Sequence, residues 1–411
     1  FFAGRIRPRK KPIRAAVSFL LSTLCSTLGA MVFTVPLSAY YFGVFSTVAP
    51  LTSLLCIPLA SWNFMAGFLT ALLGFVFLPA AQVLGYVCRV LTKLFLWVVD
   101  LACAIPYHAL YTDTNPYLVW WLVFVYAVFL LCILSRDRGR KYAFAAGVSL
   151  LTLVLCITLR TGEFRGNALT AVAVDVGQGA STLLRSGEDT ILVDCGSSNR
   201  YKKPAQQVLS QLGSMGVERL SAVAVTHYHA DHTNGLYALL ARLSVDTLYL
   251  PDIEDEYGVR ERLTALAEEK DVQVVWVTDT VTCPLGQAVL TVYPPVKSGG
   301  DLNELGLTAL ATSGDFDLLI TGDMSGSTER KLAETYPLPD VEVLVVSHHG
   351  SRYSSNIRFL KAVMPEAAVI SVGDNNYGHP SEETLQRLLA VGADIWRTDQ
   401  QGTIRITVNG G

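Results

Sequence analysis

Charged side chains are scarce in this chain of 411 residues: Asp, Glu, Lys and Arg make up 16% of it, against about a quarter in soluble proteins. The scarcity lies in residues 1–160, which hold 13 basic and only 3 acidic residues, a net charge of +10. The rest of the chain carries a net charge of −13 and has an ordinary globular composition. We therefore expect an apolar membrane domain over residues 1–160, a linker over 161–167 and a globular domain over 168–411.

Cysteine is also sparse outside the apolar part, where only Cys195 and Cys283 occur. Two cysteines are too few for a disulfide framework, and the other six act as small hydrophobic residues in the apolar part. The chain lacks an initial methionine, and no signal peptide precedes the first apolar run. We expect from this that it is a fragment whose N-terminus is missing.

Apolar runs long enough to cross a bilayer dominate the first part. A spanning helix needs about 20 mostly apolar residues. Spans are predicted near residues 15–41, 64–80, 83–104, 118–134 and 142–159. The shorter run 49–60 contains Pro50 and Pro58, and is either a re-entrant helix or a span joined to its neighbour.

Basic residues predict how the spans are oriented, because Lys and Arg are enriched on the cytoplasmic side. The clusters 5–14 and 136–141 are therefore expected in the cytoplasm, and the loop 111–116, which has an acid and no base, outside. The last span then delivers the globular domain to the outer face. This predicts a multi-pass, lipid-embedded membrane protein.

Short β-rich runs alternate with helical segments after Asn167, which is typical of an α/β domain. Strands are predicted at 169–176, 190–194, 220–227, 246–250, 272–277, 288–293, 316–323, 341–348, 367–373 and 402–408. Helices are predicted at 204–215, 233–243, 259–270, 327–335, 356–362 and 382–390. Polar residues follow the ends of several strands, where α/β folds place their chemistry.

Three of the seven histidines fall within six residues, in the stretch THYHADHTNGL that begins at Thr226. His227, His229, Asp231 and His232 have H-x-H-x-D-H spacing in a loop that leaves a predicted buried strand. Imidazole and carboxylate groups ligate zinc, manganese and iron. The first two histidines can bind one ion and the Asp–His pair a second, and together such ions polarise a phosphoryl or carbonyl group and activate water. The alternative is a solvated loop that binds no metal.

This motif after a strand resembles the metallo-β-lactamase superfamily, whose fold is an αββα sandwich. The resemblance implies that Asp194 orients the first metal-binding histidine and that Asp323 in LLITGD bridges two metals. It implies His348 or His349 in VVSHHGS as the final ligand, with His348 favoured by the family pattern. Where the superfamily has a further histidine before the bridging aspartate, this chain offers only Asn303. An Asn oxygen is a weaker ligand, so the first site is expected to suit manganese better than zinc.

Four longer stretches resemble a narrower family, the ComEC-type competence proteins. They are DVGQGAS from Asp175, SHHGSRYSS from Ser347, SVGDNNYGHPSEETLQRL from Ser371 and WRTDQQGTIRI from Trp396. The apolar part resembles the competence domain of that family by position and character. The resemblance implies a channel for DNA uptake in the bacterial plasma membrane (the inner membrane), with single-stranded DNA and other competence proteins as partners. It also implies a nuclease (phosphodiesterase) domain, with two divalent ions, Mn or Zn, that degrades the non-transported strand.

Several residues outside the metal ligands fit such a site. The turn with Asp175 and Gln178 is either an anion-binding nest or a tight turn, and Asp175 can hydrogen-bond the metal-ligand loop. His379 in YGHPS is either structural or, as we favour, a phosphate contact or the proton donor to the leaving oxygen. Ser351 either binds phosphate or is simply solvated. The expected catalytic residues are Asp231, Asp323 and His379.

The acidic net charge of the globular part speaks against a strong nucleic-acid interface, because DNA-binding domains are usually basic. We therefore expect weak, salt-sensitive and sequence-independent DNA binding near Arg200, Lys202, Lys203 and Arg352. Two alternatives stay open. One is a hydrolase of another class, such as a phosphocholine esterase or a lactonase, because this fold hosts many substrates. The other is a non-enzymatic domain that binds or gates DNA.

Overall fold

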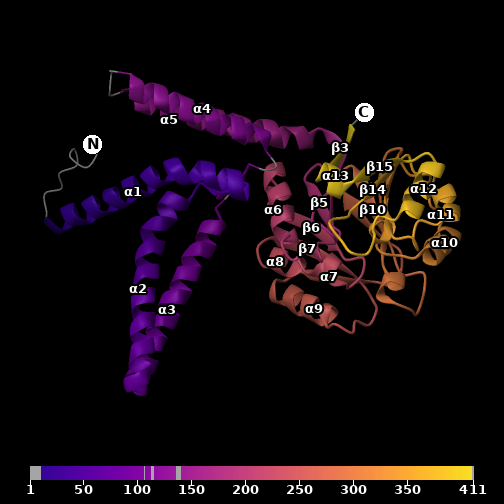
Figure 1. Ribbon diagram of the computed structural model, residues 1–411, viewed down its shortest axis with the longest axis horizontal. Coiled ribbons are helices and arrows are strands. Elements are labelled where there is room, and N and C mark those ends of the chain that lie inside the picture. Colours follow the sequence, from indigo (N-terminus) through magenta and orange to yellow (C-terminus); the bar gives the residue numbers. More distant parts are fainter. Residues whose placement is uncertain (1–10, 106, 113–114, 136–139, 410–411) are drawn as a thin grey trace. The chain divides into compact units, whose positions relative to one another are not determined.

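The computed structural model describes residues 11–105, 107–112, 115–135 and 140–409. The chain divides into two compact units, Phe1–Ile157 and Thr158–Gly411. The division falls inside the long helix that precedes the globular part (Figure 1). The basic segments 5–14 and 136–141 and the loop 111–116, on which the expected orientation depends, lie wholly or partly outside the described residues.

Long helices make up the apolar part: α1 (Lys11–Phe42), α2 (Ala49–Val76), α3 (Leu78–Cys103), α4 (Pro116–Leu134) and α5 (Arg140–Arg165). Four stretches of the described residues are long and apolar enough to cross a membrane: Leu20–Phe42, Ala49–Val76, Pro116–Leu134 and Lys141–Phe164. α3 is long enough but too polar to count among them, although a span was predicted at 83–104.

The run 49–60 continues into α2 without a break, which confirms that it is joined to its neighbour and is not a re-entrant helix. The predicted span 64–80 is wrong at its end, because α2 stops at Val76 and α3 begins at Leu78. Pro79 explains the break, since proline is favoured in the first turn of a helix and disfavoured in its interior.

A small two-stranded sheet joins the connections of the apolar part. β1 (Val44–Ser46) lies between α1 and α2, and β2 (Ala109–Tyr111) follows α3. The two strands pair antiparallel, and Phe45 and Leu110 are buried together with Leu118 of α4. The start of α2 and the end of α3 are therefore held at the same place.

Two seven-stranded sheets form the centre of the second unit. The first contains, in spatial order, β16 (Ile404–Asn409), β3 (Asn167–Ala173), β4 (Thr182–Ser186), β5 (Asp189–Val193), β6 (Arg219–Ala224), β7 (Ser244–Pro251) and β8 (Gln273–Val277). The second contains β15 (Asp394–Arg397), β14 (Ala367–Ile370), β13 (Val343–Val345), β12 (Phe316–Ile320), β11 (Thr308–Ser313), β10 (Ala288–Tyr293) and β9 (Val281–Leu285).

Three buried hydrophobic layers hold these sheets and their helices together. One layer lies between the two sheets. Another packs the first sheet against α6 (Pro204–Met215), α8 (Leu236–Leu240) and α9 (Val259–Glu269). The third packs the second sheet against α10 (Gly326–Thr335), α11 (Ile357–Val363) and α12 (Glu382–Ala390). This is an αββα sandwich, so the predicted fold class is confirmed.

Strands β4, β9, β11 and β15 were not predicted from the sequence. Pro284 within β9 argues against a strand, because proline has no backbone N–H to donate. β9 lies at the edge of its sheet, where that donor is not needed. β15 is the opposite edge, and its exposed Asp394 hides the strand pattern.

The carboxyl ends of the parallel strands position the polar loops. β5 and β6 run parallel in the first sheet, and β12, β13 and β14 run parallel in the second. Asp194 follows β5, the histidine loop follows β6, and Asp323 comes shortly after β12. The short helix η2 (Ser347–Gly350), which carries the two adjacent histidines, follows β13.

Candidate metal centre

The histidine loop leaves the end of β6 and turns at a very short helix. His227 and His232 are fully buried, whereas the side chains of His229 and Asp231 are about a quarter exposed, at 28% and 25%. α7 (Ala230–Thr233) turns the Asp231–His232 pair back toward the sheets. Both ends of the motif are therefore enclosed, while its middle is partly open to solvent.

Four residues from three loops bring one potential ligand atom each within 4.8 Å of one another. They are Asp231, His232, Asp323 and His349. Oδ1 of Asp323 lies 3.1 Å from Nε2 of His232, and its Oδ2 lies 3.7 Å from Nε2 of His349. Nε2 of His349 also lies 3.6 Å from Oδ2 of Asp231. Asp323 thus occupies the middle of the group, with one oxygen facing each histidine.

The free nitrogen atoms of this group fit a divalent cation. Nε2 of His232 and Nε2 of His349 are buried and have no hydrogen-bond partner among the described residues. The other nitrogen of each ring is held: Nδ1 of His232 is 2.7 Å from Asp194 Oδ2, and Nδ1 of His349 is 2.8 Å from the Ser371 carbonyl oxygen. Metal-binding histidines are oriented through the second nitrogen in this way.

The charges within the group favour ionised carboxylates. Burial opposes ionisation of Asp323, but the charges of His232 and His349 hold its pKa well below the usual range. Burial also opposes ionisation of Asp231, yet His349, whose Nε2 lies 3.6 Å away, and the charge of His232 lower its pKa. Although burial lowers the pKa of His232, Asp323 and Asp194 raise it overall. Two buried carboxylates therefore supply negative charge that a cation can neutralise.

The first two histidines of the motif face each other. Nε2 of His227 lies 3.2 Å from Nδ1 of His229. Burial and the charge of His232 hold the pKa of His227 well below its usual range, so its imidazole is neutral and has a free lone pair. Within the described residues, no third His, Cys, Asp or Glu completes a ligand group with this pair.

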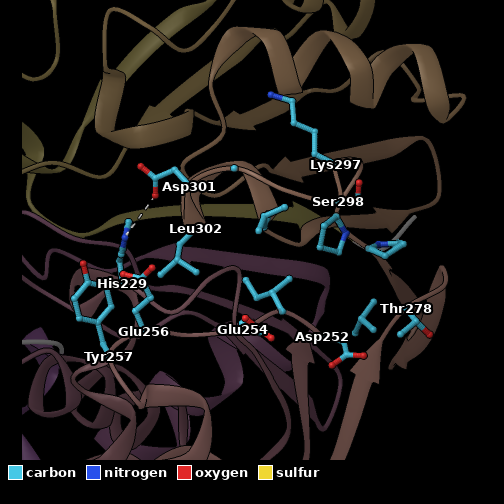
Figure 2. A pocket seen from close by; sticks show the side chains of 16 residues that line it. His229, Asp252, Glu254, Glu256, Tyr257, Thr278, Lys297, Ser298, Asp301 and Leu302 are labelled. Atoms are coloured by element: carbon cyan, nitrogen blue, oxygen red, sulfur yellow. Dashed lines mark ion pairs between the residues drawn. The ribbon is translucent and has the colours of Figure 1, made fainter.

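The segment before β11 lies near this pair. Asn303 belongs to the short helix η1 (Leu302–Leu305), and its Oδ1 is buried without a hydrogen-bond partner among the described residues. The segment is tied to the histidine loop, because Leu307 N donates to the Thr226 carbonyl at 2.8 Å. Asp301, which sequence reasoning missed, lies 4.0 Å from Nε2 of His229, the ring nitrogen that does not face His227 (Figure 2).

Asp194 holds a different histidine from the one expected. Its two oxygens accept hydrogen bonds from Thr226 N at 2.7 Å and Thr226 Oγ1 at 2.6 Å, and Oδ2 also meets His232. His227 is reached only through Thr226 Oγ1, which lies 3.1 Å from its Nδ1. The pairing with His232 follows from the turn of α7, which brings His232 back beneath the end of β5.

His349 belongs to the four-residue group, although His348 was favoured from the sequence. His349 is buried, whereas the side chain of His348 is 32% exposed and its Nε2 is 3.9 Å from Asp323 Oδ2. Both histidines have left-handed backbone conformations, with φ of 52° and 54°. This conformation is strained for non-glycine residues and persists only where the surroundings enforce it.

A buried carboxylate and a guanidinium enforce that loop, and sequence reasoning missed both. Glu329 of α10 accepts hydrogen bonds from Ser347 Oγ at 2.6 Å and from the backbone N–H groups of Ser355 and Asn356 at 2.9 Å. Arg387 of α12 donates to the carbonyl oxygens of Arg352, Ser354 and Ser355. Both residues lie on the face of a helix that packs on the loop, and no sequence motif marks them.

The remaining predicted residues are mainly structural. Asp175 accepts from Gly177 N at 3.0 Å and pairs with Lys202 at 2.8 Å, instead of bonding the histidine loop. Gly177 has a φ of 80°, which fits the tight turn. Gln178 is buried, with its side-chain oxygen 3.3 Å from Gly373 N. Ser351 is buried, and its carbonyl oxygen accepts from Thr384 Oγ1 at 2.7 Å.

His379 lies beside His348, the partly exposed member of the two adjacent histidines. The ring centroids of His379 and His348 are 5.5 Å apart, and Nδ1 of His379 is buried without a hydrogen-bond partner among the described residues. Burial and the charges of His348 and His349 lower the pKa of His379 to about 4. At neutral pH its imidazole is therefore uncharged, which suits a hydrogen-bond contact better than proton donation by an imidazolium.

A cavity of about 800 Å³ opens beside His229 (Figure 2). Its walls carry four carboxylates, those of Asp252, Glu254, Glu256 and Asp301. One cation, Lys297, also lines it but is paired with Glu304 at 2.7 Å. The Tyr257 ring lies on the same side as His229, with centroids 6.4 Å apart. The cavity is acidic and partly apolar, so it does not suit a phosphate group.

Comparisons with known proteins agree with the two units. Residues 174–374 match the metallo-beta-lactamase superfamily, and residues 1–138 match the family described as competence protein. The chain is 29% identical to competence protein ComA of Neisseria gonorrhoeae over 387 residues, and 25% identical to ComE operon protein 3 of Bacillus subtilis over 411 residues. Each alignment covers 93% of this chain but 51% of the relative, so the chain spans about half the length of these relatives.

One solved structure is similar to part of this chain. The metallo-beta-lactamase fold protein YhfI of Bacillus subtilis has a TM-score of 0.41 and 14% sequence identity to this chain. The similarity covers 58% of this chain and all of YhfI.

Proposed function

Because the chain joins a competence-protein domain to a metallo-β-lactamase domain, we propose that it takes up DNA across a bacterial plasma membrane and hydrolyses phosphodiesters. One strand passes through the membrane part, and the domain on the outer face degrades the other. The observation that carries the proposal is the pair of buried Nε2 atoms of His232 and His349, which face two carboxylates and have no hydrogen-bond partner among the described residues, together with four candidate spans in the described part of the chain.

Six residues would hold the metal ions of this reaction. Asp231, His232, Asp323 and His349 suit one divalent ion, and His227 with His229 suits a second, with Asp323 shared as the family resemblance implies. Bound ions would polarise the phosphoryl group and lower the pKa of water, so that water attacks phosphorus at neutral pH. Because no third histidine among the described residues joins His227 and His229, we expect manganese to be preferred to zinc.

The other residues of the site orient the histidine rings or contact the phosphate. Asp194 and the Ser371 carbonyl keep the rings of His232 and His349 in one orientation, so that their Nε2 lone pairs point to one place. The neutral ring of His379 and the exposed Arg352 lie at the open side and contact the phosphate. Lys202 forms an ion pair with Asp175, so few cationic side chains remain to contact the DNA backbone. This supports weak, salt-sensitive and sequence-independent binding.

The test is hydrolysis of single-stranded DNA by the purified full chain in detergent with Mn²⁺. Asp323→Asn removes charge from the middle of the metal group and should abolish nucleotide release. Asp394→Asn changes an exposed aspartate of an edge strand and should leave the rate unchanged. DNA binding without any cleavage would contradict the nuclease and favour a gating domain. Two tightly held zinc ions after purification would contradict the preference for manganese.

The acidic cavity beside His229 favours a second candidate function. Its carboxylates and Tyr257 suit a cationic head group, because a quaternary ammonium is attracted by both negative charge and aromatic faces. A phosphocholine ester would then place its phosphate at the metal centre. Hydrolysis of p-nitrophenylphosphocholine but not of DNA by the same preparation would support this function in place of the nuclease.

A further inference from the structure

Polar and aromatic side chains follow one face of α3, an otherwise apolar helix. They recur every three or four residues, which places them on a single stripe of the helix surface. We call this set the polar stripe, and all its side chains are exposed: Gln82, Tyr86, Arg89, Lys93, Trp97 and Asp100.

The connections of α3 require it to cross the membrane if α2 does. β1 leads into α2, β2 follows α3, and the two strands are hydrogen-bonded to each other. α2 is a candidate span, and only Phe77 separates it from α3. The two helices run side by side (Figure 1), so α3 returns through the same thickness of bilayer to the side on which α2 began.

Contacts along this hairpin show how deep the charges of α3 lie. Asn63 Nδ2 donates to Thr92 Oγ1 at 3.0 Å, and Thr70 Oγ1 lies 3.8 Å from Cys88 Sγ. Arg89 is therefore level with the stretch of α2 between Asn63 and Thr70, near the middle of a helix of 28 residues. Ionised side chains at this depth are rare, and they face a water-filled path or an opposite charge.

The polar stripe is not covered by α2, because all its side chains are exposed. Gly85, Cys88 and Thr92, which contact α2, lie on the side of α3 next to the stripe, about a quarter turn from its centre. In the part of the chain that the structure describes, neither cation forms an ion pair with an acidic side chain. Ion pairs among the described residues therefore do not explain why this face of α3 carries charged side chains.

We propose that the polar stripe is the surface along which a single nucleic-acid strand moves through the membrane, an inference that rests on the proposed uptake function. Arg89 and Lys93 contact phosphates, which needs no particular sequence. Tyr86 and Trp97, one turn to either side of the cations, stack with bases, as aromatic residues do in proteins that bind single strands. The water that accompanies the strand hydrates the charges.

Cysteine accessibility in the full chain tests this. The six cysteines of the apolar part are replaced by serine, while Cys195 and Cys283 stay because they are buried. Tyr86→Cys and Lys93→Cys then probe the polar stripe, and Val83→Cys and Leu94→Cys probe an exposed apolar flank of the same helix. A membrane-impermeant thiosulfonate should label the stripe at least about tenfold faster, because an apolar environment raises the thiol pKa. Single-stranded DNA should slow the labelling of the stripe.

Each outcome decides a separate part of the proposal. If Tyr86→Cys and Lys93→Cys were labelled no faster than Val83→Cys and Leu94→Cys, or not at all, the polar stripe would not face water and the proposal would be overturned. Labelling that single-stranded DNA does not slow would overturn nucleic acid as the occupant. Arg89→Gln with Lys93→Gln should abolish the slowing, whereas Arg89→Lys with Lys93→Arg should retain it. Metal-dependent hydrolysis should be unchanged in both double variants, and its absence from the unsubstituted chain would instead count against the proposed nuclease.

Discussion

The Nδ1 atom of His232 lies 2.7 Å from Oδ2 of Asp194, a residue 38 positions earlier in the chain. Asp194 follows β5 and His232 follows β6, and the two strands are parallel neighbours in the sheet. The contact fixes the imidazole so that Nε2 faces Asp323. It therefore connects the first sheet to the group of potential metal ligands.

Asp194→Asn should weaken metal binding. An asparagine cannot accept all three hydrogen bonds that Asp194 receives from Thr226 and His232, and so it releases the ring. Loss of such an orienting partner lowers metal affinity by about 10- to 100-fold. Calorimetric titration of the purified chain with Mn²⁺ measures this. Asp246→Asn, in an exposed pair with Arg219, is the control and should bind normally; equal affinity in both variants would contradict the role of Asp194.

The two adjacent histidines should differ sharply when each is replaced. His349→Ala removes a buried member of the four-residue group, so the affinity for the ion held there should fall by more than the about 100-fold typical of an orienting partner. His348→Ala removes a side chain that is a third exposed, and the metal content should be retained. Metal analysis after gel filtration compares the two variants. The reverse result would restore His348 as the ligand.

Glu329→Gln should destabilise the loop that carries these histidines. The amide group would face a backbone N–H that now donates to the carboxylate, and a buried donor without a partner costs about 1–3 kcal/mol. Thermal unfolding of the purified chain measures the loss, and Mn²⁺ affinity should fall with it. Glu382→Gln, at an exposed position of α12, is the control.

The effect of Glu329→Gln should also depend on pH. Burial raises the pKa of the Glu329 carboxyl, against hydrogen bonds from Ser347, Asn356 and Ser355 that lower it. A carboxyl with a raised folded pKa contributes stability that is present below its unfolded pKa, near 4.5, and is lost as pH rises through the folded pKa. The difference in free energy of unfolding between the wild-type chain and the variant should therefore decrease from mildly acidic to neutral buffer. If this difference instead increased over the same pH range, the raised pKa of Glu329 would be contradicted.

Gly196→Ala should displace the histidine loop. A Cβ atom at Gly196 would lie 2.3 Å from the Asp231 carbonyl carbon and 2.4 Å from His232 N, so backbone would have to move. Forced overpacking of this kind costs about 1–3 kcal/mol. Gly299→Ala meets nothing within 4 Å and serves as the matched control. Thermal unfolding and Mn²⁺ affinity should both fall in the first variant only; an unchanged Gly196→Ala protein would contradict the close approach.

Sequence patterns predicted most helices and the central strands of the second unit. α6 and α12 have the predicted bounds, because a proline or a capping serine marks their first turn and an apolar stripe their length. The four missed strands lack such signals. β9 and β15 lie at sheet edges, where a proline or a charge is tolerated, and only the pairing with β10 and β14 makes them strands.

The sequence by itself determined the apolar part, the α/β class of the second unit and the H-x-H-x-D-H motif, because these depend on composition and on residues close together in the chain. Only the tertiary structure decided which of His348 and His349 joins Asp323, which histidine Asp194 holds, and that Glu329 and Arg387 enforce the loop. These relationships link residues on different strands and helices. The spacing along the chain fixes which side chains share a loop, whereas the packing of the sheets and helices fixes which loops meet.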